Sequence, residues 1–293
     1  MINVDAIIFR EFKCKADKCK HSCCEGWEID IDEDTLDYYK GLDTELGNEI
    51  LQNIHEGEDT YFKLTDDERC PFLKDNGLCK IIEEMGEDGL CDICRLHPRF
   101  FESINDYNLA GVGLSCEKAA ELIFGKTSLE FIICDSDKKL DFYELLKLLD
   151  IDIPEDYLKL SNGIPDHLEE EKIERILDVF YGTEPIDDSW MNEVLLIKRF
   201  YKDYLDSLEI EKYEVIYQYI IFRQLELIVK YGIEKIIGYA IYSILFIMLY
   251  AKAFHDEIEA ARRWSEQIEY NEDNIAYILD EMTVSPYSDL CKR

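Results

Sequence analysis

Residues 14–27 read CKADKCKHSCCEGW and concentrate four cysteines in one short stretch: Cys14, Cys19, Cys23 and Cys24. Their spacing is irregular and fits neither the period of a helix nor that of a strand. Thiolates that converge on a metal can be supplied by short loops, without regular structure between them. The stretch therefore predicts a loop-rich region that is organised around a metal.

The same kind of motif continues along the chain. Further cysteines follow at Cys70, Cys79, Cys91, Cys94 and Cys116, so that nine of the eleven cysteines lie between residues 14 and 116. In a reducing compartment such a set is not a disulfide scaffold. A cubane iron–sulfur cluster takes four thiolates, or three with one iron left open. Nine thiols exceed one site, so two sites or spare cysteines both remain open.

Zinc is the alternative metal. The pair Cys91-x2-Cys94 suits a zinc knuckle, but no second pair of that kind stands at the usual separation. The irregular spacing and the adjacent residues Cys23 and Cys24 favour iron–sulfur instead. Buried, incidental cysteines are a third interpretation. It suits Cys134 and Cys291 best, because they lie outside the motifs.

The second half of the chain differs in kind. From about residue 136, apolar residues recur at helical spacing, and long helices are expected over residues 190–208, 211–231, 233–254 and 256–270. The sequence thus predicts a mainly α fold. In it, a loop-rich, cysteine-rich metal-binding region of residues 1–135 packs on a helical domain of residues 136–293.

Charge and hydropathy restrict the partners and the location. Lys and Arg number 32 against 65 Asp and Glu, a net charge of −33 that repels nucleic acids and anionic lipid surfaces. We therefore expect no nucleic acid and no membrane as partner. The uncharged residues 236–251 are short for a membrane span and predict a buried helix. Asp5 and Glu11 interrupt any signal-peptide pattern, which predicts a cytoplasmic protein.

As a set, the motifs resemble the flagellin lysine N-methylase family and the wider group of cysteine-cluster proteins described as zinc- or iron-chelating. The resemblance covers roughly the first 120 residues. Its elements are Phe12-x-Cys14, Cys19-x3-Cys23-Cys24-x-Gly26-Trp27, Cys70-Pro71-Phe72-Leu73, Gly77-Leu78-Cys79, Cys94-x2-His97-Pro98-Arg99 and Leu114-Ser115-Cys116. The chain departs from the family at His97, where Tyr is usual, and at Glu117, where Pro is usual. Cys91 is an addition to the pattern.

This resemblance implies methyl transfer from S-adenosylmethionine to lysine side chains of flagellin, linked to an oxygen-sensitive [4Fe–4S] cluster. The metal ligands that it implies leave out Cys91 and are Cys14, Cys19, Cys23, Cys24, Cys70, Cys79, Cys94 and Cys116. Catalytic and cofactor-binding residues are not identified. The alternative is a non-catalytic iron–sulfur or zinc module whose helical half binds a protein partner.

A Rossmann-type cofactor site needs a glycine-rich turn between a strand and a helix. The nearest match is Gly111-Val112-Gly113, which directly precedes the Leu114-Ser115-Cys116 motif. We interpret these glycines as a close backbone approach to the metal loop.

Overall fold

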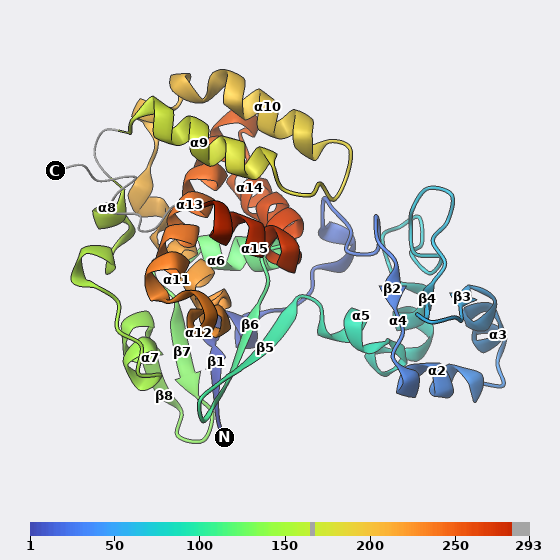
Figure 1. Cartoon of the computed structure of the whole chain (residues 1–293). Coiled ribbons are helices and arrows are strands. Elements are labelled where there is room, and N and C mark those ends of the chain that lie inside the picture. Colours follow the sequence, from blue (N-terminus) through green and yellow to red (C-terminus); the bar gives the residue numbers. More distant parts are fainter. Residues whose placement is uncertain (165–167, 283–293) are drawn as a thin grey trace. The chain divides into compact units, whose positions relative to one another are not determined.

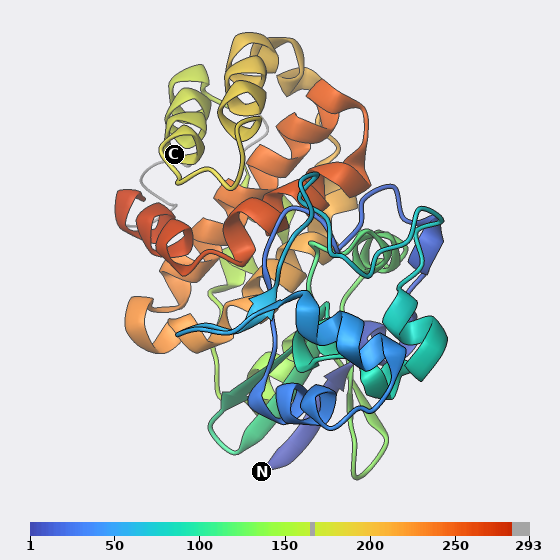
Figure 2. The ribbon, with the colours of Figure 1, turned by 90° about the vertical axis from the view of Figure 1, so that its right-hand side faces the viewer.

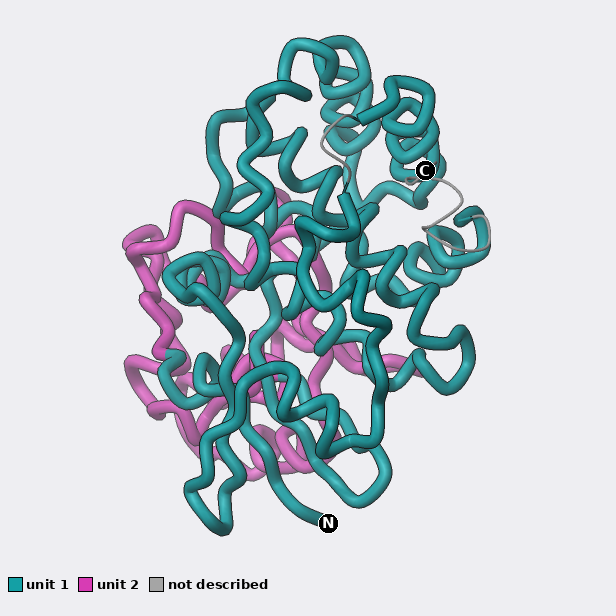
Figure 3. The backbone as a smooth tube through the Cα atoms, turned by 90° about the vertical axis from the view of Figure 1, so that its left-hand side faces the viewer, with its two compact units in different colours: residues 1–12, 100–293 teal, residues 13–99 magenta. Residues whose placement is uncertain are grey.

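The computed structural model describes residues 1–164 and 168–282, and the chain divides into two compact units (Figures 1 and 3). Unit 1 comprises residues 1–12 and 100–293, and unit 2 comprises residues 13–99. Unit 2 is thus an insertion between Phe12 and Phe100, whose side chains are both buried in the core of unit 1. The boundary expected after residue 135 instead falls between two paired strands of unit 1.

Unit 1 contains a five-stranded mixed sheet with the strand order β5-β6-β1-β7-β8. The central strand β1 runs parallel to β6 and antiparallel to β7, so that Val4 stands opposite both Leu109 and Ile133. An antiparallel pair of β7 and β8 completes one edge. The strands are β1 (Ile2–Ala6), β5 (Arg99–Ile104), β6 (Tyr107–Val112), β7 (Glu130–Ile133) and β8 (Lys138–Asp141).

This sheet shows that the expectation of a mainly α fold was wrong: the protein is mixed α/β, although mostly helical. The strands are short, with four to six residues each. β6 reads YNLAGV, in which Asn108, Ala110 and Gly111 are residue types depleted in strands. The parallel pairing joins Ile2 to Tyr107, and a local sequence pattern cannot report such a distant contact.

Several helices of unit 1 pack around α13 (Ile233–Phe254), which is buried along most of its length. The Phe246 ring stacks on Phe180 of α9 at 4.3 Å between centroids and lies 5.3 Å from Trp190 of α10. In Figure 1, α9 and α10 lie side by side above α13. The other helices of unit 1 are α1 (Ile7–Glu11), α6 (Glu117–Phe124), α7 (Phe142–Leu148), α8 (Leu160–Gly163), α9 (Glu170–Tyr181), α10 (Trp190–Phe200), α11 (Glu214–Arg223), α12 (Ile228–Tyr231), α14 (Glu257–Trp264) and α15 (Glu272–Glu281).

Short 3-10 turns and one π-helix interrupt three of the four expected long helices. The helix expected over residues 233–254 is confirmed with the same bounds. The other three are shorter, because α10 ends at Phe200, α11 ends at Arg223 and α14 continues as a π-helix, η8 (Ser265–Glu269). The 3-10 helices are η1 (Ala16–Lys18), η2 (Glu87–Gly89), η3 (Glu155–Tyr157), η4 (Tyr201–Asp203), η5 (Leu205–Ser207), η6 (Ile210–Tyr213) and η7 (Leu225–Leu227).

By length and composition, α13 could cross a membrane, and it is the one helix of this kind in the described part of the chain. Its most apolar window is 89% buried inside the protein. Every residue from Ile236 to Ala251 is buried, which confirms the expected buried helix. The pattern is that of a helix at the centre of a protein core.

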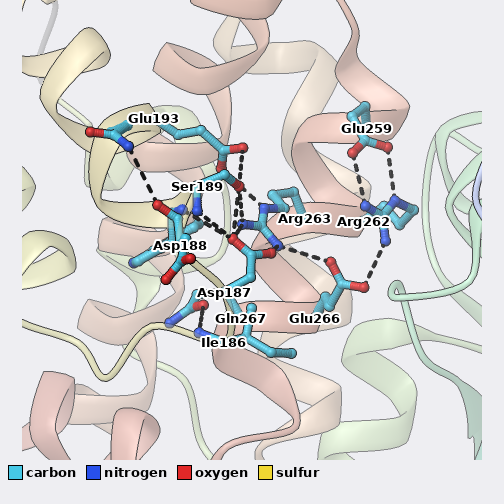
Figure 4. Close-up of polar contacts among 12 residues, drawn as sticks. Ile186, Asp187, Asp188, Ser189, Glu193, Glu259, Arg262, Arg263, Glu266 and Gln267 are labelled. Carbon is cyan, nitrogen blue, oxygen red and sulfur yellow. Dashed lines mark hydrogen bonds and ion pairs between the residues drawn. The ribbon is translucent and has the colours of Figure 1, made fainter. Parts of the chain in front are cut away.

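A nearly buried guanidinium ties α14 to the segment that leads into α10 (Figure 4). The Arg263 side chain is 5% exposed and pairs with Asp187 at 2.7 Å, Glu193 at 3.0 Å and Glu266 at 3.2 Å. Two of these carboxylates come from residues about 70 positions away along the chain. The ion pairs therefore fix a tertiary contact rather than a helix turn.

Unit 2 is built from small elements, which Figure 2 shows together. A three-stranded antiparallel sheet, in the order β2-β4-β3, packs with four short helices around Tyr39, Phe62 and Phe72. Asp32 caps the first of these helices by accepting the Thr35 N–H at 2.9 Å. The elements are β2 (Ile29–Asp30), α2 (Glu33–Lys40), α3 (Glu45–Gln52), β3 (Ile54–His55), β4 (Tyr61–Phe62), α4 (Lys80–Met85) and α5 (Asp92–Leu96).

Candidate metal centre

Five cysteines of unit 2 pack together in and against its core. Cys70 and Cys91 are buried there, and Cys24, Cys79 and Cys94 are partly buried against the same cluster of side chains. Cys70, Cys79 and Cys94 each lie within electrostatic range of both Cys24 and Cys91. None of the ten cysteines in the described residues forms a disulfide. We call these five residues the thiol cluster.

Backbone hydrogen bonds bring the first three of these cysteines together from distant parts of the chain. The Cys70 N–H donates to the Cys24 carbonyl at 2.8 Å. The following loop turns back at Gly77, whose φ of +78° favours glycine, and Cys79 then forms a bridge with Leu73. Because these contacts are backbone contacts, the loops hold Cys24, Cys70 and Cys79 near one another without any metal.

The remaining two cysteines are placed by α5. Cys91 precedes the first residue of this helix and Cys94 lies one turn further on. Asp32, at the start of α2, also accepts the Asp92 N–H at 2.8 Å. The Tyr39 hydroxyl at the other end of α2 donates to the Gly89 carbonyl at 2.7 Å. Helix α2 therefore fixes the segment that carries Cys91.

Burial and hydrogen bonding set the protonation of the thiols. Burial raises the pKa of Cys70 to about 12, against a hydrogen bond from the Phe72 N–H. The thiol of Cys94 hydrogen-bonds to Cys91, which lowers the pKa of Cys91 and raises that of Cys94. Burial raises the pKa of Cys79, although two N–H groups of α4 donate to its sulfur and oppose that rise. Such N–H donors stabilise thiolates, the form that binds metals.

The thiol cluster fits a metal by the chemistry of its donor atoms, which are sulfurs. Within residues 1–164 and 168–282, no three Cys, His, Asp or Glu side chains converge closely enough to hold an ion. The thiol cluster supplies more than the four soft donors that zinc or an iron–sulfur cluster takes, and its backbone is already held in place. A bound metal would require the side chains to turn toward one point.

The other cysteines of the first motif lie nearer the surface. Cys14 and Cys23 are exposed and Cys19 is half-buried. A hydrogen bond from Cys23 lowers the pKa of Cys24 to about 7, so Cys23 lies directly beside the thiol cluster. The sulfur of Cys14 accepts the Ala16 N–H at 3.3 Å. A role for Cys14, Cys19 or Cys23 as a metal ligand stays a prediction.

Cys116 belongs to unit 1, where it precedes α6. The loop before it is anchored by two tyrosines. The Leu114 N–H donates to the Tyr219 hydroxyl at 3.2 Å, and Tyr270 lies close enough to interact electrostatically with Cys116. A Cβ on Gly113 would stand 2.0 Å from the Tyr270 hydroxyl, so the close backbone approach is to this ring. The role of Cys116 as a metal ligand stays a prediction.

Two cysteines were assigned to no site by the sequence. Cys134 follows β7, and its thiol hydrogen-bonds with Arg10 and Asp5. Cys291 lies outside the described residues.

Sequence reasoning missed a buried polar network around Arg223 in unit 1. The guanidinium of Arg223 pairs with Glu102 at 2.6 Å and with Glu269 of the π-helix at 3.1 Å. The Tyr219 hydroxyl donates to Glu269 at 2.7 Å. Glu102, Arg223 and Glu269 come from β5, α11 and η8, so no spacing rule links them. A π-helix frequently marks a functional site, and here it supplies Glu269.

Comparison with known proteins gives three weak similarities. Two proteins named lysine-N-methylase, from Salmonella typhimurium (strain LT2) and Salmonella choleraesuis (strain SC-B67), are 26% identical over 122 residues, which is 38% of this chain and 30% of each methylase. The flagellar biosynthetic protein FliU of Salmonella muenchen is 26% identical over 122 residues, 70% of its length. No family model and no solved structure matches.

These findings define a cysteine-rich α/β protein with distant similarity to lysine-N-methylases. The similar stretch spans about a third of the length of the two methylases.

Proposed function

We propose that this protein is an iron–sulfur-dependent lysine N-methyltransferase that uses S-adenosylmethionine and acts on flagellin in the cytoplasm. The names of the three similar proteins support lysine methylation and a link to the flagellum. The observation that carries the metal part is the thiol cluster, because it gathers five free cysteines in one small unit. Zinc is the alternative metal for the same thiols.

The reaction sets requirements that the chain meets in part. A lysine is positively charged at neutral pH and must lose a proton before its nitrogen can attack a methyl carbon. A net charge of −33 attracts a cationic side chain toward the protein. A [4Fe–4S] cluster bound by three thiolates would supply an open iron at which a small molecule can bind. The residue that accepts the lysine proton is not assigned.

The second candidate is a non-catalytic metal module, with unit 1 as the surface that binds a protein partner. Its support is that unit 2 is a separate compact unit with its own core. A metal there would stabilise a small fold without taking part in a reaction.

An anaerobic assay distinguishes the methyltransferase from the non-catalytic metal module. Reconstituted protein, S-adenosylmethionine and flagellin from the same source are incubated, and added methyl groups on flagellin lysines are read by mass spectrometry. We expect methylation by the wild type and by Cys134→Ser, and a strong loss in Cys70→Ser. An intact metal centre that neither binds the donor nor transfers a methyl group would support the non-catalytic module.

A further inference from the structure

We propose that Cys91 is a ligand of the metal centre, and that all protein ligands of this centre come from residues 13–99. The inference rests on the metal centre of the proposed function, but it does not depend on methyl transfer.

The position of Cys91 is central to the thiol cluster. Its side chain is 1% exposed, which makes it the most buried cysteine of the cluster. The thiols of Cys70, Cys79 and Cys94 all lie within electrostatic range of it. Cys94 lies nearest, because its thiol hydrogen-bonds to Cys91, so a metal held by Cys94 would lie near the sulfur of Cys91.

The local structure fixes Cys91 independently of a metal. Its carbonyl accepts the Arg95 N–H at 2.9 Å, and the next residue, Asp92, is held by Asp32 of α2. Burial favours the protonated form of Asp32, but the N–H groups of Asp92 and Thr35 lower its pKa. The contact is thus one between a carboxylate and backbone donors, which is stronger than a neutral hydrogen bond.

The composition of the core of unit 2 also argues for a ligand rather than a filler. This core has eleven buried apolar residues, two of which are cysteines. Domains with small cores commonly depend on a metal or on disulfides. No disulfide joins the described cysteines, so a bound metal is the cross-link that these thiols could supply to unit 2.

The second part of the inference concerns Cys116. Cys24, Cys70, Cys79, Cys91 and Cys94 already exceed the four thiolates that a metal centre takes. Cys116 lies in unit 1, in a loop that Tyr219 and Tyr270 anchor. The centre therefore needs no ligand from unit 1.

The test uses the full-length protein, reconstituted anaerobically with ferrous iron and sulfide. The decisive variant is Cys91→Val, which keeps an apolar side chain of similar size but removes the thiolate. If Cys91 only fills the core, Cys91→Val will hold as much metal as the wild type. Cys134→Val is the matched control, because it makes the same chemical change at a thiol in unit 1.

Iron and acid-labile sulfide per chain are measured, together with the absorption spectrum and the paramagnetic resonance spectrum of the reduced protein. We expect Cys91→Val to lose at least half of the iron and to change the resonance spectrum of any cluster that remains. Cys134→Val and Cys116→Ser should keep the wild-type iron content. Thermal unfolding of the metal-free proteins checks that Cys91→Val and the wild type have similar apo-protein stability.

The outcomes are distinct. Wild-type iron content and an unchanged spectrum in Cys91→Val would overturn the assignment of Cys91. An equal loss in Cys116→Ser would overturn the claim that residues 13–99 supply every ligand. A wild type that binds metal but transfers no methyl group would remove the proposed reaction and leave this inference standing. A wild type that binds no metal would remove both.

Discussion

Arg223 Nη1 lies 2.6 Å from Oε1 of Glu102, while the other carboxylate oxygen of Glu102, Oε2, is buried without a hydrogen-bond partner. The pair therefore satisfies only half of the carboxylate. Burial raises the pKa of Glu102 to about 8 despite the favourable charge of Arg223. A buried acid in this condition keeps its proton to unusually high pH, and it makes folding sensitive to pH.

Replacing Glu102 by Gln should remove this sensitivity. The folded protein keeps the Glu102 proton up to pH about 8, whereas the unfolded chain loses it near the ordinary value of 4.5. Wild-type stability should therefore fall as the pH rises between these values, by roughly 1.4 kcal/mol for each unit of pKa shift. Glu102→Gln stays neutral, so its free energy of unfolding should exceed that of the wild type more at pH 9 than at pH 5.

The measurement is denaturant unfolding at both pH values, read by the fluorescence of Trp190 and Trp264 in a Trp27→Phe background. Glu130→Gln, at an exposed position on β7, is the control. An equal pH dependence of wild type and Glu102→Gln would show that Glu102 is not buried as described.

Gly113→Ala should destabilise unit 1 by about 2 kcal/mol, because the added methyl group would overlap the Tyr270 hydroxyl. Tyr270→Phe in the same chain should recover part of that loss. At Gly125 an added Cβ would meet its neighbours at 3.4 Å, an ordinary contact, so Gly125→Ala is the control. Thermal unfolding of the wild type and these three variants checks the prediction. Equal midpoints for Gly113→Ala and Gly125→Ala would contradict it.

Arg263→Met should cost roughly 3 kcal/mol at neutral pH, because it leaves Asp187 and Glu193 without their shared cation. Arg262→Met is the matched control. Arg262 pairs with Glu259 and Glu266 of its own helical segment, and pairs at such spacing contribute less than about 1 kcal/mol. Figure 4 shows both sets of contacts. Chemical denaturation would compare the free energies of unfolding of Arg263→Met and Arg262→Met. A larger loss in Arg262→Met would contradict the prediction.

Anaerobically purified protein should be coloured and contain iron and acid-labile sulfide, and air should bleach it. The physical reason is the density of free thiols in unit 2. Metal and sulfide analysis with absorption spectroscopy tests this. Stoichiometric zinc without sulfide would instead assign the thiol cluster to a structural zinc site.

Local patterns in the sequence were sufficient for some elements and insufficient for others. The helix Ile233–Phe254 could be predicted, because a long run of apolar residues is itself a local signal. The sheet could not, since β1 finds its partners Leu109 and Ile133 only through tertiary folding. The same limit hid the contact between Glu102 and Arg223, which are 121 residues apart.

For the candidate metal centre, the motifs predicted the part of the chain that carries the cysteines, but not which cysteines lie together. Cys70, Cys79 and Cys94 were expected as ligands, and the structure places them in one thiol cluster. Cys91 was left out because the resemblance does not include it, although it is the most buried thiol of the five. Burial at this position depends on α2 holding the start of α5, which spacing alone does not reveal.

The order of elements along the chain has a consequence for synthesis on the ribosome. Strand β1 is made first, yet it occupies the middle of the sheet and must wait for Tyr107–Val112 and Glu130–Ile133 before it can pair. All of residues 13–99 emerge during that interval, and they form a compact unit of their own. Unit 2 can therefore fold while the rest of the protein is still a nascent chain.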